Sequence, residues 1–66
     1  MKPEPGQLWE AHEPAAGHKE RSLLYVLSNE EARGHRGMAM CYSMAGHDAG
    51  RAALWTLSES FYRRVA

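Results

Sequence analysis

Four histidines and one cysteine are the side chains of this 66-residue chain best suited to bind a metal ion. They are His12, His18, His35, Cys41 and His47. A structural zinc site usually draws its ligands from closely spaced pairs such as CxxC or HxxxH, and the chain contains no such pair. His12 and His18 are separated by the proline- and glycine-containing segment EPAAG, which fixes no geometry. We therefore predict no metal site and no cofactor, and we expect the histidines to lie in exposed loops.

Nucleophilic catalysis by Cys41 would require a nearby histidine and a lowered thiol pKa. The segment MAMCYSM instead alternates bulky and small residues, which places Cys41 on the small-residue face of a strand as a buried, inert thiol. The chain has neither a GxSxG motif nor a glycine-rich phosphate loop. A chain this short also has room for only a small core. We predict that the protein is not an enzyme; the enzymatic alternative is a site formed between subunits.

The charges balance overall but are unevenly placed. Eight basic and eight acidic residues give a net charge near zero, and this leaves little repulsion between copies, so a homodimer is one expected assembly. The first half is acidic and the second half basic. The longest apolar run, residues 23–27, is too short to span a membrane, and no apolar signal follows the N-terminus. We predict a cytoplasmic protein without a membrane partner.

Proline, glycine and hydrophobic periodicity define the expected elements. Pro3 and Pro5 predict an extended leader over residues 1–5, followed by a single domain over residues 6–66. The segment RSLLYVLS predicts a central strand, and MAMCYSM predicts the next one. We expect the bulky face of MAMCYSM to fill the core, and the alternative is an interface. That face consists of Met38, Met40, Tyr42 and Met44.

The C-terminal segment supports two interpretations. A helix over residues 48–65 would place most of its apolar residues on one face, which favours an α+β fold with a C-terminal amphipathic helix. Alternatively, RAALWTLS is a strand, SESF is a tight turn and YRRV is a final strand. The local pattern leaves both interpretations open.

The order of GQLWEAHE, SLLYVLS, AMCYSM and ALWTLSESFYRRV resembles short bacterial and phage proteins built as SH3-like barrels. The resemblance implies a mainly β fold, in which five short strands form a small barrel and a 3-10 turn precedes the last strand. It further implies that Trp55 and Phe61 close one end of the barrel, while Arg63 and Arg64 face water. The acidic and aromatic segment that lines the proline-peptide groove of signalling SH3 domains is missing.

We predict a non-enzymatic binding module whose partner is another protein. The resemblance implies a phage or mobile-element accessory or inhibitor protein that binds a host macromolecular complex, for example an anti-CRISPR or other counter-defence protein. The predicted partner-binding residues are Arg36, Arg51, Tyr62, Arg63 and Arg64. The alternative is a small nucleic-acid-binding barrel that uses the same basic and aromatic surface, although dedicated binders of this size usually carry a clear positive charge.

Overall fold

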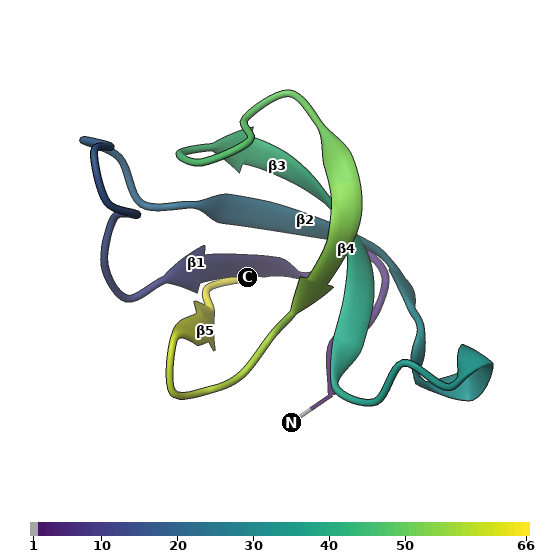
Figure 1. The fold of residues 1–66 in the computed structure, drawn as a ribbon. Helices are drawn as coiled ribbons and strands as arrows, with labels where there is room; N and C mark the ends of the chain where they lie inside the picture. Colours follow the sequence, from purple (N-terminus) through teal and green to yellow (C-terminus); the bar gives the residue numbers. More distant parts are fainter. Residues whose placement is uncertain (1) are drawn as a thin grey trace.

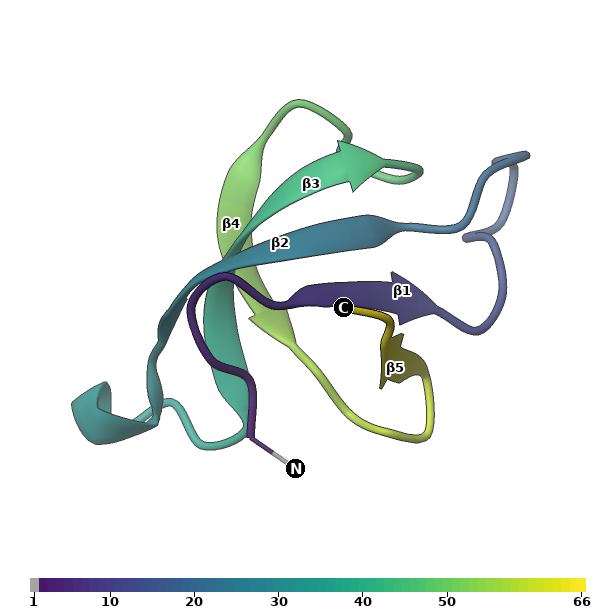
Figure 2. The ribbon, with the colours of Figure 1, turned by 180° about the vertical axis from the view of Figure 1, so that it is seen from behind.

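The computed structural model describes residues 2–66, which form five short strands and one turn of 3-10 helix (Figure 1). The elements in chain order are β1 Leu8–Ala11, β2 Leu23–Asn29, η1 Glu31–Arg33, β3 Met38–Ala45, β4 Ala52–Thr56 and β5 Tyr62–Arg64. All strand pairs are antiparallel, and the sheet has the order β4-β3-β2-β1-β5. The sheet is strongly twisted, so that β4 crosses the direction of β2 steeply in both views (Figures 1 and 2). The prediction of a mainly β fold with five strands is confirmed.

One face of the sheet encloses a small core. Its members are Trp9, Leu24, Val26, Ala39, Cys41 and Leu57, with Trp55 and Tyr62 packed against them. The strand register explains this grouping, because Trp9 lies opposite Leu24 and Val26 lies opposite Cys41. Directly paired residues share a face of the sheet. Most of the interior is therefore supplied by alternate residues of neighbouring strands.

The small residues of β3 face the core, and the larger Tyr42 and Met44 face outward, which is the reverse of the expectation. Ala39, Cys41 and Ser43 are fully buried, whereas Tyr42 is 43% exposed and Met44 is 52% exposed. The prediction that the bulky face fills the core is therefore wrong. Register shifts occur on both sides of the central part of β2, and such irregularities increase the bend of a sheet. The concave side of this bent sheet already holds Trp9, so small residues fit beside it on β3.

The C-terminal segment is strand, turn and strand, and the alternative of a helix over residues 48–65 is wrong. Leu57 N–H donates to the Gly37 carbonyl at 3.1 Å and Val65 N–H donates to the Leu8 carbonyl at 2.8 Å, so these amides bond to distant parts of the chain and not to a preceding helical turn. Before β5, the Ser58 carbonyl accepts hydrogen bonds from Phe61 N–H at 3.0 Å and from Tyr62 N–H at 2.8 Å, which close a tight turn at the position of the predicted 3-10 turn.

The aromatic residues of this segment divide between the two sides of β5. Tyr62 lies opposite Ala11 and packs on the core, so the preceding Phe61 points to the other side of the extended chain. Phe61 is 69% exposed, and the expectation that it closes the barrel is wrong. Leu57 fills the position in the core instead, while Trp55 does pack against that core as predicted.

The leader lies against the end of β2. Pro3 is buried, and its carbonyl accepts a hydrogen bond of 2.8 Å from Asn29 Nδ2. Gly6 N–H donates to the Val26 carbonyl at 2.9 Å. In the part of the chain that the structure describes, no helix is long and apolar enough to cross a membrane.

Candidate protein-binding surfaces

The predicted binding residues do not form one surface. Arg36 lies in the loop that precedes β3, and Arg51 follows the turn after β3, so the two arginines are at opposite ends of this strand (Figure 1). The other three, residues 62–64, form β5, which is the edge strand at the other end of the strand order from β4. The structure brings together only the three residues that are neighbours in sequence.

Two of these arginines are ion-paired. Arg63 lies opposite Glu10 in the β1–β5 register, and its guanidinium donates to Glu10 Oε1 at 3.0 Å. Arg21 approaches the same carboxylate oxygen at 3.8 Å. Arg51 lies 3.9 Å from Asp48 Oδ1. These carboxylates offset much of the positive field that a phosphate backbone would require.

Tyr62 has a structural role. Its side chain is half-buried against the core cluster. Burial raises the pKa of Tyr62, while a hydrogen bond with Trp55 acts in the opposite direction and the nearby Cys41 raises it further. The phenol therefore contributes to the contact between Trp55 on β4 and Tyr62 on β5.

Cys41 is buried, and two of the four histidines contact each other. Cys41 is completely buried, and burial raises the pKa of its thiol to about 11. His18 Nε2 and His47 Nδ1 are 3.4 Å apart, and His47 Nε2 is 3.3 Å from Asp48 Oδ2. Among residues 2–66, no group of three histidine, cysteine or acidic side chains is positioned to hold a metal ion. The expectation that Cys41 is a buried thiol on the small-residue face is confirmed.

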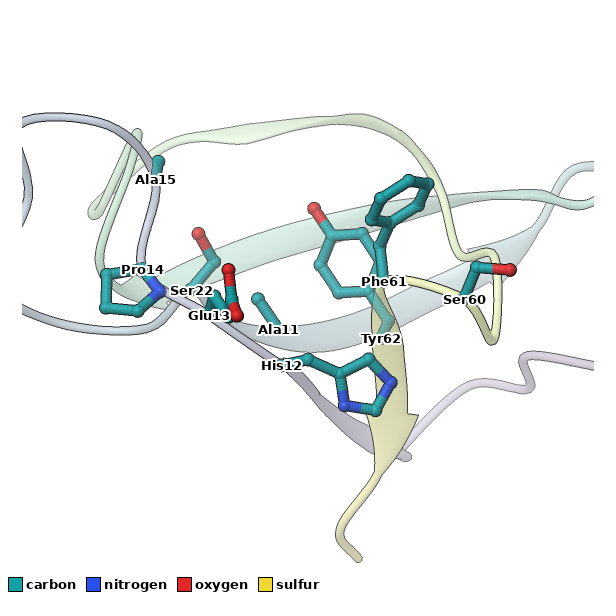
Figure 3. Close-up of a pocket in the computed structure, with 9 residues that line it drawn as sticks. All are labelled: Ala11, His12, Glu13, Pro14, Ala15, Ser22, Ser60, Phe61 and Tyr62. Atoms are coloured by element: carbon teal, nitrogen blue, oxygen red, sulfur yellow. The ribbon is translucent and has the colours of Figure 1, made fainter.

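A groove of about 700 Å³ lies between the β1–β2 loop and the turn before β5 (Figure 3). Figure 3 shows the rings of Phe61 and Tyr62 on one side and Pro14 and Ala15 on the other. His12 is held at this site by a contact of 3.1 Å between its Nε2 and the Glu59 carbonyl. No local sequence pattern indicates this groove, because its walls come from residues 11–22 and residues 60–62.

A second exposed surface covers the outer face of β2 and β3. Tyr25 lies directly opposite Tyr42 in the register of these strands. Leu27 lies two residues after Tyr25 on β2, and Met44 lies two residues after Tyr42 on β3, both on the same outward side. All four side chains are exposed. We call Tyr25, Leu27, Tyr42 and Met44 the outer patch. The period-two pattern of MAMCYSM contained this face, but only the structure shows which side of the strand faces water.

Charged side chains lie next to the start of β2, close in register to the outer patch. Glu10 lies beside Leu23 in the β1–β2 register, and its carboxylate is paired with Arg21 and Arg63.

Comparison of the chain with protein-family models, curated proteins and solved structures finds no match.

Proposed function

We propose that the protein is a non-enzymatic protein-binding module of the SH3-like barrel type, which binds a partner protein through the outer patch. The strand order β4-β3-β2-β1-β5 and the hydrogen-bonded turn at Ser58 support the SH3-like part of the proposal. The outer patch supports the binding part.

The observation that carries the proposal is the exposure of four large apolar side chains on two neighbouring strands. Their exposed fractions range from 40% to 52%, although inner-face residues of the same strands are fully buried. Soluble monomers rarely expose large contiguous apolar patches without a use for them. Tyrosine and methionine are also enriched in protein interfaces. The outer patch therefore has the composition of an interface core.

The chemistry of the outer patch defines the class of partner. None of its four side chains is charged, and the carboxylate of Glu10 beside it is neutralised by two arginines. An uncharged apolar protein face, with polar groups for the two phenol oxygens, matches such a surface. A nucleic acid would instead require free cations near the aromatic residues.

A more specific form of the proposal is a cytoplasmic accessory protein of a phage or mobile element that inhibits a host complex, for example an anti-CRISPR protein. The resemblance to short phage proteins supports this form. A single small domain with one apolar face is also suited to cover a functional surface of a larger assembly.

The test compares partner capture by three tagged proteins expressed in the native host and purified after nuclease treatment. They are the unaltered protein, Tyr25→Thr/Tyr42→Thr, and the control Phe61→Thr. Threonine keeps a high strand propensity, and Phe61 is an equally apolar exposed residue outside the outer patch. Thermal unfolding of each purified variant establishes that it is folded.

We expect a stoichiometric protein partner with the unaltered protein and with the control, insensitive to moderate salt, and its loss from the double tyrosine variant. Retention of the partner by the folded tyrosine variant would show that the outer patch is not the binding surface. Recovery of nucleic acid alone, lost on digestion and at high salt, would replace the proposal with the nucleic-acid alternative.

A further inference from the structure

The two edges of the sheet differ in how they are protected. At one edge, β5 has only three residues, and two of them are arginines. At the other edge, β4 has five residues with the sequence AALWT, without a charge, a proline or a register shift against β3. Short length, charge, proline and bulges are the usual means by which natural proteins prevent edge strands from pairing with other chains. The edge formed by β4 has none of the last three.

The backbone groups that face this open edge can be assigned from the ladder between β3 and β4. Ser43 N–H donates to the Arg51 carbonyl at 2.8 Å, and Leu57 N–H donates to the Gly37 carbonyl at 3.1 Å. Hydrogen-bonded pairs alternate along an antiparallel ladder, so Ala53 and Trp55 also bond to β3. The N–H and C=O groups of Ala52, Leu54 and Thr56 therefore point to the open edge, which no strand within residues 2–66 covers.

We propose that β4 pairs with β4 of a second copy of this chain, antiparallel and around a twofold axis, with Leu54 opposite Leu54 of the partner subunit. In this register Ala52 lies opposite Thr56 of the partner subunit, and Thr56 lies opposite the partner subunit's Ala52. Each of these pairs can exchange both backbone hydrogen bonds, as in any hydrogen-bonded antiparallel pair. Every outward-facing backbone group of β4 would then be paired.

The side chains favour the same register. Trp55 shares the inner face with Ala39 and remains partly exposed. The register centred on Leu54 places Trp55 opposite the partner subunit's Ala53, a large residue against a small one. A shift centred on Trp55 would set the two tryptophans directly against each other and leave Ala52 unpaired. The sequence of β4 is therefore self-complementary in one register.

Electrostatics do not oppose the dimer. The chain has a net charge near zero, and β4 contains no ionisable side chain. This inference does not depend on the proposed function, because the outer patch lies on β2 and β3 and the dimer contact lies on the edge of β4.

The experiment measures the molar mass of purified protein by light scattering or sedimentation over a concentration series. We expect the unaltered protein to reach twice the chain mass of 7.4 kDa. Ala52→Lys/Thr56→Lys places like charges opposite each other at two cross-strand positions, which should weaken dimerisation roughly tenfold or more. Ala52→Lys/Thr56→Glu places opposite charges at the same two positions and should restore it.

Both substituted side chains are exposed, and the two double variants carry the same number of changes, so each serves as the folding control of the other. A monomer at every concentration of the unaltered protein would overturn the proposal. Equal dimerisation of the two double variants would overturn the register. The Tyr25→Thr/Tyr42→Thr variant should remain dimeric, which separates failure of this inference from failure of the proposed function.

Discussion

The indole Nε1 of Trp9 donates a hydrogen bond of 3.0 Å to Oε1 of Gln7, two residues earlier in the chain. The same oxygen accepts the backbone N–H of Glu4 at 2.9 Å. Both side chains are buried. One amide oxygen therefore connects the leader to the largest residue of the core.

Replacement of Gln7 by methionine should destabilise the protein by about 2 kcal/mol or more, because a buried donor left without its acceptor costs about 1–3 kcal/mol. Urea unfolding measures the change. In the matched Gln7→Met/Trp9→Phe variant, the indole N–H is removed together with its acceptor, so the loss should be smaller than the sum of the two single losses. Strict additivity would show that the two side chains are not coupled.

The thiol of Cys41 should resist modification in the native protein. It is completely buried, and its pKa is raised from the ordinary value of 9.0 to about 11, so at neutral pH it is an inaccessible, protonated thiol. We expect an aromatic disulfide reagent to react only after denaturant is added. Fast reaction of the whole native population would contradict this.

The same thiol makes the fold sensitive to alkali. A raised native pKa means that the unfolded state loses its proton first, so stability is intact below about pH 9 and falls as the pH rises toward 11. The raised pKa of Tyr62 acts in the same direction. Urea midpoints measured from pH 8 to pH 11 should decline, and Cys41→Ala should decline less steeply. An identical pH dependence of the two proteins would exclude the thiol as a cause.

Gly46 allows the β3–β4 turn to lie directly on the start of β2. Its φ is +82°, and an added Cβ would lie 2.7 Å from backbone atoms of Ser22. Gly46→Ala should therefore cost about 2–4 kcal/mol, from left-handed strain and from the backbone clash together.

Gly50 supplies the matched control for this substitution. Its φ is +86°, but a Cβ there would meet no atom within 4 Å, so Gly50→Ala should cost only the left-handed term of about 1–2 kcal/mol. Thermal or urea unfolding compares the two variants. Equal losses would show that the approach to Ser22 has no energetic effect.

Leu57 should contribute more to the stability of the fold than Phe61, although phenylalanine is the larger residue. Leu57 is buried in the core, so Leu57→Ala should cost about 2–5 kcal/mol. Phe61 is mostly exposed on the wall of the groove, so Phe61→Ala should change stability by about 0.5 kcal/mol or less. Unfolding midpoints of the two variants decide the comparison, and a larger loss for Phe61→Ala would contradict the assignment of the core.

The strands could be predicted because their signals are local. Branched and aromatic residues in RSLLYVLS and the alternation in MAMCYSM each indicate an extended segment. The side of β3 that faces the core is not a local property. It depends on the volume already occupied by Trp9 and on the bend of β2, and both are set by distant parts of the chain.

The candidate surfaces depended even more on tertiary structure. Sequence grouped five residues by their chemistry, whereas the fold places Arg36 and Arg51 at opposite ends of β3 and pairs Arg63 with Glu10. The separation of 53 residues between Arg63 and Glu10 gives no sequence pattern that would reveal their pairing. The outer patch and the open edge of β4 likewise emerge only once the register is known.

The position of β1 between β2 and β5 also constrains how the protein folds. Leu8 exchanges backbone hydrogen bonds with Val65 and Ala66, at the other end of the sequence. During synthesis, β1 can pair with β2 early, but its second edge stays open until residues 62–66 have been made. Closure of so long a loop is entropically costly and typical of slowly folding β proteins. The nascent chain therefore carries an additional unpaired strand edge for as long as residues 12–61 are being made.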